Sequence, residues 1–321
     1  MKFKNLKVLG RQTFTKEKIA FIINPKSGVN KKHTLPSMVQ GTIDPLRFDV
    51  DFFFTKCAGH ATELTACLLE NSYSRIVAVG GDGTINEVAK AMINSDAILG
   101  IIPCGSGNGL ARFLDIPLKI KEAIELQNTG KIIAIDYGLI NDNPFFCTCG
   151  VGFDAHIGNK FAHSARRGFF TYLKETLAAF LYYKPKKYTI KVDGKKIKTK
   201  AFLITAANAG QYGNDVFIAP HADISDGLLD VCILNPFPKY KAFHLGFRLF
   251  NKTIDRSEYV KVIKGQAITI KRKKKGEVHL DGEPAIMGKK LKIKIINMGL
   301  KVIVSANYSG KAIIKEISGL R

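Results

Sequence analysis

The chain has 321 residues, 46% of them hydrophobic and 24% charged, which is enough for two domains with sizeable cores. Its 49 Lys and Arg against 27 Asp and Glu give a net charge of +22, so we expect an anionic partner: nucleic acid, an acidic membrane surface or a phosphate-rich ligand. The basic N-terminus lacks the apolar core of a signal peptide, and no apolar run approaches the ~18–20 residues of a membrane span. Six scattered cysteines are typical of reduced thiols in a cytoplasmic protein and do not suggest a zinc site.

The first part of the chain alternates between apolar strands and helical patterns. We expect residues 1–17, which are polar and basic, to form a loose lead-in or an edge strand. Strands are predicted next at 18–23, 47–54, 76–79 and 97–102. Helices are predicted at 60–70, 84–93, 110–114 and 119–126. This alternation favours a doubly wound parallel sheet, and three of its strands end in glycine-containing turns at the edge where such sheets bind ligands.

The stretch 75–91, RIVAVGGDGTINEVAKA, joins a buried strand, a glycine turn and a helix. Thr84 and Glu87 have the spacing of a capping box, so we expect Thr84 to cap the helix. Backbone N–H groups of the glycines, next to a helix N-terminus, form an anion site suited to phosphate. Asp82 would repel a phosphate there unless a metal or a proton intervenes, which favours Mg-nucleotide chemistry. The chain has neither the lysine of a Walker A loop nor the last glycine of a dinucleotide fingerprint.

The second part of the chain is dominated by strand patterns. They occur at 132–140, 145–149, 188–193, 197–207, 228–234, 266–272, 277–281, 290–296 and 300–305. Their density predicts an all-β domain, a sandwich or a partly closed barrel. Helical segments are expected at 169–183, 240–250 and 311–320. We therefore divide the chain into an α/β nucleotide-binding domain over 1–138 and a β-sandwich domain over 139–321, whose tail packs back on the first domain.

Six motifs follow one another along the chain. They are Asn24-Pro25-x-Ser27-Gly28, Gly80-Gly81-Asp82-Gly83-Thr84 with Asn86-Glu87, Pro103-x-Gly105-Ser106-Gly107-Asn108, Val151-Gly152-Phe153-Asp154, Pro220-His221-Ala222-Asp223-x-x-Asp226-Gly227-Leu228 and Asp281-Gly282-Glu283. This ordered set resembles the diacylglycerol kinase catalytic-domain family, which includes soluble bacterial lipid kinases, sphingosine kinases and ceramide kinases. The resemblance covers nearly the whole chain. It implies a nucleotide domain of the NAD kinase/phosphofructokinase type, a β-sandwich, an active site between them, and phosphorylation of a lipid hydroxyl with ATP and Mg²⁺.

The resemblance also assigns residues to the binding of the nucleotide. The phosphates would be held by Gly80, Gly81, Asp82, Gly83, Thr84, Asn86, Glu87, Gly105 and Ser106. Asn24, Thr55 and Glu283 would complete the cofactor-binding set. Asp154 would join Asp82 in a network of carboxylates, water and Mg²⁺ near the γ-phosphate. The alternative for Asp154 is an aspartate that only caps a turn.

Asp281 is the candidate general base. Phosphoryl transfer is mainly positioning and charge stabilisation, so a carboxylate needs only to accept the proton of the attacking hydroxyl. The alternative is a plain Asp-Gly hairpin turn, which is what we expect of Asp193-Gly194. Pro284 follows Asp281 closely, and proline is a poor start to a paired strand, which favours the catalytic interpretation.

The resemblance implies a second, structural Mg²⁺ site at Asp223, Asp226 and the carbonyl of Leu228, whose hard oxygen ligands suit this ion. The alternative is an Asx turn before a strand. We expect the loop at 212–215 to be reshaped, because Tyr212-Gly213-Asn214-Asp215 stands where the family has a glycine pair. The sequence also departs from the family at Gly109, where bacterial members usually carry an acidic residue. This departure favours sphingoid-type or other long-chain lipids over diacylglycerol.

The basic charge suggests an anionic membrane surface. Lysine-rich runs at 184–187 and 271–275 are suited to lipid headgroups, with solvated loops as the alternative. Aromatic residues that would insert at the interface are Phe237, Tyr240, Phe243, Phe247 and Phe250, although core packing is the commoner role and we expect it for most of them. We therefore expect a lipid kinase with peripheral membrane association, no nucleic-acid partner and a possible homodimer. The alternatives are an NAD kinase-like enzyme and a non-catalytic basic protein that binds lipid or nucleic acid.

Overall fold

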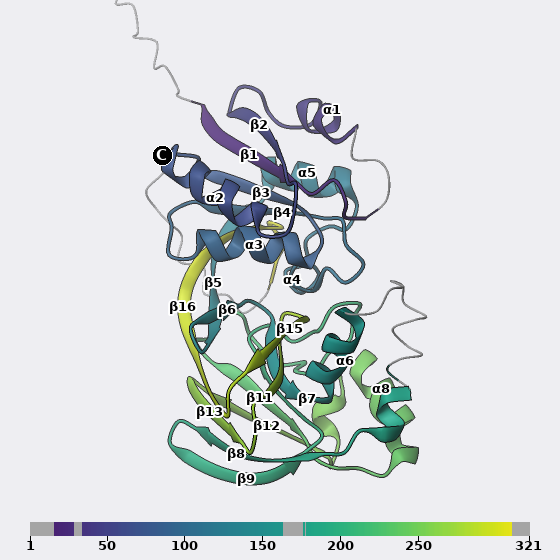
Figure 1. Cartoon of the computed structure of the whole chain (residues 1–321). Coiled ribbons are helices and arrows are strands. Elements are labelled where there is room, and N and C mark those ends of the chain that lie inside the picture. The colour runs from purple at the N-terminus through teal and green to yellow at the C-terminus, as the bar shows by residue number, and fades with distance from the viewer. Residues whose placement is uncertain (1–15, 29–33, 163–175, 177, 310–321) are drawn as a thin grey trace, which may run out of the picture.

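The computed structural model describes residues 16–28, 34–162, 176 and 178–309 (Figure 1). The order of strands in its larger, ten-stranded sheet is β2-β1-β3-β4-β16-β13-β8-β9, with β5 and β6 beside β16. A six-stranded sheet has the order β12-β11-β10-β7-β14-β15. None of the helices in the described residues is long and apolar enough to cross a membrane.

The N-terminal part is the predicted α/β unit. Its strands are β1 (Glu17–Ile23), β2 (Phe48–Phe54), β3 (Arg75–Gly80) and β4 (Ile98–Pro103), all paired in parallel. Its helices are α1 (Leu35–Gln40), α2 (His60–Glu70), α3 (Asp82–Met92), α4 (Gly109–Phe113) and α5 (Ile120–Thr129). Every residue of β3 and β4 is buried, as expected of strands covered by helices on both faces.

Alternate residues of these strands enter separate cores on the two faces of the sheet. Ala20 and Ile22 pack in the cluster that contains Val88 of α3. Ile19 and Phe21 pack in the cluster that contains Val39 of α1 and, on α5, Ile124. The period of two along the strand therefore places helices on both faces, and the predicted doubly wound arrangement is confirmed.

The C-terminal part is the predicted β-sandwich. Its strands are β7 (Thr148–Gly152), β8 (Lys186–Val192), β9 (Lys195–Ala201), β10 (Leu203–Ala207), β11 (Leu229–Leu234), β12 (Val260–Gly265), β13 (Ala267–Arg272), β14 (Gly276–Leu280) and β15 (Glu283–Met287). Ile190, Ile268 and Leu291 from the larger sheet share one core with Ile204 and Val231 from the smaller sheet. Two sheets packed over one apolar layer define a sandwich.

The two parts share a long antiparallel ribbon, and this corrects the predicted strand pattern. Residues 290–296 and 300–305 were expected to form separate strands, but β16 (Lys290–Val304) is continuous, with a register shift between Ile296 and Leu300. It pairs with β5 (Lys131–Ile140) along its length and with β4 at its end. Figure 1 shows β16 passing from the sandwich into the N-terminal sheet.

Several smaller elements complete the fold. They are β6 (Asn143–Phe145), α6 (Phe153–Ala162), the 3-10 turns η2 (Lys239–Lys241) and η3 (Ile254–Arg256), and α8 (Ala242–Phe250). The sequence missed α6 and predicted a turn in its place. The helix expected at 169–183 falls largely outside the described residues, as do the N-terminal lead-in at 1–15 and the tail helix at 311–320.

Candidate active site

Three turns meet at the carboxyl edge of the N-terminal sheet. The first of these turns, after β1, is fixed to α3, because Asn24 donates its side-chain amide to Thr84 Oγ1 at 2.9 Å. The second turn, after β3, and the third turn, after β4, touch backbone to backbone: a Cβ on Gly105 would lie 2.7 Å from the Cα of Gly81. Only glycine permits this approach. The predicted gathering of the three turns is therefore present in the structure.

The carboxylate of Asp82 holds the third turn. Its two oxygens accept the backbone N–H groups of Asn108 at 2.8 Å and of Gly109 at 2.7 Å. Asn108 in turn closes the loop, because its side chain accepts the N–H of Gly105 and donates to the carbonyl of the same residue. Part of the charge of Asp82 is thus met by backbone dipoles, which the sequence argument for a metal did not consider. Ser106 lies exposed at the tip of this turn.

The predicted capping box is wrong. The helix α3 begins at Asp82, so Thr84 lies within its first turn and does not cap it. Glu87 instead accepts the N–H groups of Gly59 at 2.9 Å and Ala61 at 3.1 Å, at the start of α2. A carboxylate near the N-terminus is favourable for α2 and for α3 alike. Because α2 packs against α3, Glu87 of α3 contacts the N-terminus of α2. Glu87 is therefore placed at α2 and away from the glycine turn.

Asp281 stands at the tip of the hairpin that joins β14 to β15. The dihedral angle φ is +49° at Asp281 and +86° at Gly282, as in the two-residue turns that such hairpins favour. Pro284 pairs with His279 in the ladder, so the argument that proline excludes a hairpin here is wrong. Because β15 is an edge strand, Pro284 can lie in it without removing a hydrogen bond from the sheet, although proline has no N–H group.

The hairpin geometry does not remove Asp281 from the candidate site. Its carboxylate accepts three backbone N–H groups, from Phe146 at 2.8 Å, Cys147 at 2.7 Å and Thr148 at 2.9 Å. Burial raises the pKa of this carboxyl, and the three N–H groups and Lys90 offset only part of that rise. An ionised carboxylate has about four acceptor positions, so one remains for an incoming hydroxyl.

The same hairpin reaches the N-terminal part of the molecule. A Cβ on Gly83, in the first turn of α3, would lie 3.3 Å from Glu283 Oε1. Lys90, two turns further along α3, lies 3.9 Å from the carboxylate of Glu283. The predicted cofactor residue Glu283 therefore lies directly against the glycine turn, although more than 190 residues separate them in the sequence.

Asp154 lies in a buried polar cluster that the sequence did not reveal. In the first turn of α6, its Oδ2 atom lies 2.8 Å from Thr205 Oγ1, 3.0 Å from His279 Nε2 and 3.2 Å from the hydroxyl of Tyr212. Its other oxygen accepts the N–H of Ala155 at 2.8 Å. Burial raises the pKa of Asp154, but His279 and these hydrogen bonds outweigh it and lower the pKa overall.

Replacing His279 by leucine should remove one of the hydrogen-bond partners of the buried carboxylate of Asp154. We expect a loss of unfolding free energy of about 1–3 kcal/mol at pH 7, the cost of leaving a buried polar group short of a partner. The pKa of Asp154 is lowered in the native wild type, so the stability it supplies is present at neutral pH and lost as the pH falls through that lowered value. In the variant the lowering of the pKa by His279 is lost, so acid protonates the carboxyl of Asp154 at a higher pH and removes the cost of burying its charge.

The difference in stability between wild type and His279→Leu should therefore be largest at pH 7 and shrink towards pH ~4, measured by denaturant unfolding at both pH values. His221→Leu is the control, because His221 is exposed and lies 3.5 Å from Asp255. It should change stability by ~1 kcal/mol or less. A pH-independent loss for His279→Leu would contradict the role of His279 in lowering the pKa of Asp154.

The three predicted catalytic aspartates gather around one strand. The buried Cys147 thiol has its pKa raised by burial and by the charges of Asp281 and Asp82. Two residues on, burial and the charges of Asp281 and Asp154 raise the pKa of Cys149. The charges of Asp82, Asp154 and Asp281 thus all act on thiols at the start of β7.

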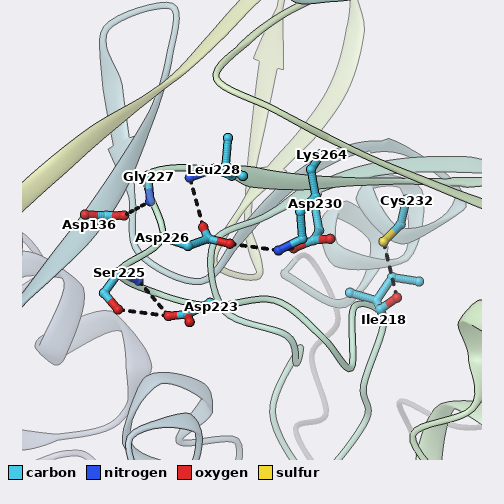
Figure 2. A network of polar contacts seen from close by, with 10 residues as sticks. All are labelled: Asp136, Ile218, Asp223, Ser225, Asp226, Gly227, Leu228, Asp230, Cys232 and Lys264. Carbon is cyan, nitrogen blue, oxygen red and sulfur yellow. Dashed lines mark hydrogen bonds and ion pairs between the residues drawn. The ribbon is translucent and has the colours of Figure 1, made fainter. Parts of the chain in front are cut away.

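At the implied second metal site, the aspartate side chains already interact with other residues of the protein (Figure 2). Asp226 lies 2.8 Å from the ammonium of Lys264, which also lies 3.4 Å from Asp230. Asp223 accepts the N–H and the hydroxyl of Ser225, the geometry of the Asx turn given as the alternative. A divalent cation on Asp226 would meet the charge of Lys264, so these residues as arranged do not fit Mg²⁺.

A further buried acid, Asp136 of β5, anchors this loop. Its oxygens accept the N–H groups of Gly227 at 2.8 Å and Met298 at 2.7 Å, and burial raises its pKa. The described residues contain no cluster of three or more His, Cys, Asp or Glu side chains that could hold a metal ion. Asp136 was not a candidate in the sequence because its strand context resembled ordinary core.

Thr55, Asn86 and Gly109 are the remaining residues that the sequence singled out. Thr55 is buried at the end of β2, where its N–H bonds to the carbonyl of Ile23. Asn86 is buried in α3. Gly109, the departure from the family pattern, packs against the loop at 212–215: a Cβ there would lie 3.5 Å from the nitrogen of Gly213. The altered residue and the altered loop are therefore in contact.

Comparisons with known proteins agree with this architecture. A model of the diacylglycerol kinase catalytic domain matches residues 18–140, and a model of the YegS C-terminal NAD kinase beta sandwich-like domain matches residues 147–304. The chain is 27% identical to a diacylglycerol kinase of Bacillus subtilis, over 82% of this chain and 88% of that protein. It is 30% identical to a probable lipid kinase YegS-like protein of Enterobacter sp. (strain 638), over 70% of this chain and 76% of that protein.

The fold has been seen before in a solved structure. A crystal structure of a diacylglycerol kinase from Bacillus anthracis superposes with a TM-score of 0.70 at 22% identity, covering 91% of this chain and 98% of that one. At 22% identity this similarity shows the fold alone. The two family models and the Enterobacter relative show to which family the chain belongs. The chain therefore belongs to the diacylglycerol kinase family of lipid kinases.

Proposed function

We propose that the protein transfers the γ-phosphate of ATP to the hydroxyl of a long-chain lipid. The observation that carries the proposal is the contact between the β14–β15 hairpin and the first turn of α3. It brings Glu283 of the sandwich, two residues after Asp281, to the first turn of α3 in the α/β part. A phosphate held by the turns and a base on the hairpin would then face each other, as in-line transfer requires.

The chain offers a cradle for the phosphates. The first N–H groups of α3 have no partner within the helix, and the positive end of the helix dipole lies at the same place. The close approach of Gly81 to Gly105 leaves no room for a side chain between these two turns. Asn24 fixes the first turn of α3 by its bond to Thr84, so the cradle is formed before any nucleotide binds.

Mg²⁺, bound with the nucleotide, would neutralise charge on the transferring phosphoryl group. Asp82 fits such an ion best, because each of its oxygens holds a single N–H and keeps a free lone pair. Asp154 fits less well, since its Oδ2 atom is already surrounded by three donors. We assign Asp154 to positioning: with His279 it fixes the N-terminus of α6 beneath the hairpin.

Asp281 would accept the proton of the lipid hydroxyl. Its three backbone hydrogen bonds fix its orientation, and the raised pKa makes it a stronger base than an ordinary aspartate. Lys90 lies close enough to stabilise the ionised form, and its contact with Glu283 ties the helix to the hairpin.

The decisive experiment offers the purified protein and Mg-ATP a panel of acceptors in mixed micelles: diacylglycerol, monoacylglycerol, sphingosine, ceramide and undecaprenol, with NAD in solution. We expect radiolabelled phosphate in at least one lipid and none in NAD. The contact of Gly109 with the reshaped loop at 212–215 leads us to expect a preference for sphingoid-type lipids. Labelling of NAD alone, or of nothing in the panel, would refute the proposal.

A further inference from the structure

An exposed row of aromatic side chains lies along α8 and the turn before it. Tyr240, Phe243, Phe247 and Phe250 follow at intervals of three and four residues, and they are 78%, 88%, 57% and 54% exposed. Leu245, on the other side of the helix, is 4% exposed. Our expectation that most of these aromatics pack in the core is therefore wrong. The helix directs its aromatic side away from the protein.

The row continues onto the chain that precedes β8. Leu181 is 54% exposed and Tyr182 is 84% exposed. The two segments touch, because the Lys239 ammonium donates to the carbonyl of Leu181 at 2.7 Å. We call the combined surface the aromatic face; it consists of Leu181, Tyr182, Tyr240, Phe243, Phe247 and Phe250. Exposed apolar surface of this kind marks an interaction site.

A rigid layer of rings supports the aromatic face from within. Phe237, the one aromatic of the segment that packs inward, stacks on Phe180 with ring centroids 5.9 Å apart and meets Phe202 edge-on at 5.1 Å. Phe202 lies 4.7 Å from Phe153, the residue before Asp154. Figure 1 shows α6 and α8 on the same side of the sandwich. The face is thus joined through one layer of rings to the helix that carries Asp154.

The surroundings of the aromatic face are cationic. Residues 236–252 contain four cations and no Asp or Glu, and residues 178–192 contain four lysines and no acid. Within the described residues, none of these cations forms an ion pair with a carboxylate. Aromatic rings beside unpaired Lys and Arg are the pattern of a helix that lies in the interface of an anionic bilayer.

We propose that the aromatic face inserts into the headgroup region of an anionic membrane and holds the α6 side of the protein against the lipid. A second copy of the chain fits the same surface poorly, since two identical cationic surfaces would repel each other. The proposal extends the proposed function by naming the surface that meets the membrane. Only the expected benefit to catalysis rests on the proposed function, because binding of the aromatic face to the membrane is measured without ATP.

The chain has no tryptophan, so Phe243→Trp places a single reporter on the aromatic face. Its emission should shift to the blue on adding phosphatidylglycerol vesicles, and much less with phosphatidylcholine alone. Leu46→Trp is the control, because Leu46 is 81% exposed on the N-terminal part. Its emission should stay unchanged. No shift at position 243, equal shifts at both positions, or a shift that follows protein concentration without vesicles would overturn the proposal.

A second pair of variants measures affinity. Phe243→Ser with Phe247→Ser should lower binding to phosphatidylglycerol vesicles at least tenfold, as judged by sedimentation, while Leu46→Ser should not change it. With a short-chain lipid in detergent, the double variant should keep its turnover, and with substrate in vesicles it should lose it. Unchanged vesicle binding would overturn the docking surface. If the wild type binds vesicles but phosphorylates no lipid, the kinase proposal fails and the docking surface stands.

Discussion

Asp281→Asn should lower kcat by about 10²–10⁴-fold, the usual contribution of a general base. The amide keeps the shape of the side chain but loses the basic oxygen. It also turns an NH₂ group towards one of the three backbone donors, from Phe146, Cys147 or Thr148, which should cost about 1–3 kcal/mol of unfolding free energy. Single-turnover kinetics and denaturant unfolding measure the two effects separately.

Asp193→Asn provides a matched control. Asp193 also begins an Asp-Gly hairpin turn with φ of +44°, and its carboxylate accepts the N–H groups of Gln266 and Ala267. The control variant should lose similar stability with an unchanged kcat. In the wild type, the acidic limb of the pH profile of kcat/KM should lie above the ordinary range of an aspartate, because the pKa of Asp281 is raised. A variant at Asp281 that loses stability but keeps its kcat would contradict the role as base.

Gly105→Ala should lower kcat/KM for ATP about 100-fold, with a clear rise in KM. The new methyl group would lie 2.7 Å from the Cα of Gly81 and 2.9 Å from Asn108 Oδ1, so the second and third turns have to separate. A displacement of about 1 Å in a positioning element is enough for a loss of this size. Nucleotide titration by calorimetry should show the weaker binding directly.

Gly288→Ala is the control for this change, because a Cβ at Gly288 meets no atom within 4 Å and its φ is not positive. It should leave both kcat and KM unchanged. Equal ATP affinity in the wild type and Gly105→Ala would mean that the phosphates bind elsewhere, and the turn after β4 would lose its proposed role.

Much of the fold could be predicted because the signals were local. Buried apolar runs marked β1, β3 and β4, and glycine turns at their ends marked the ligand edge. Residues 297–299 misled the prediction, since a polar residue and a glycine between two apolar runs are typical of a loop. In the structure they are an irregularity within β16, held by pairing with β5 that no local pattern could show.

The sequence indicated the carboxylates of the candidate site but not the groups that form hydrogen bonds with them. Glu87 had the right spacing for a cap on its own helix, and only the packing of α2 against α3 gave it to Gly59 and Ala61. His279 had no motif, although its position in β14, two residues before Asp281, placed it on the strand that carries the candidate base. A histidine at that position was the one available signal for the partner of Asp154.

The ribbon of β5 and β16 determines how the molecule can flex. Both strands continue from the sandwich into the α/β part, so any rotation of one part against the other must bend them. Their ladder is interrupted at residues 297–299, where Asp136 binds Met298 on one side and Gly227 on the other. Such a rotation would therefore bend the ribbon beside a buried carboxylate clamp, which links the stiffness of the ribbon to the loop of Asp223 and Asp226.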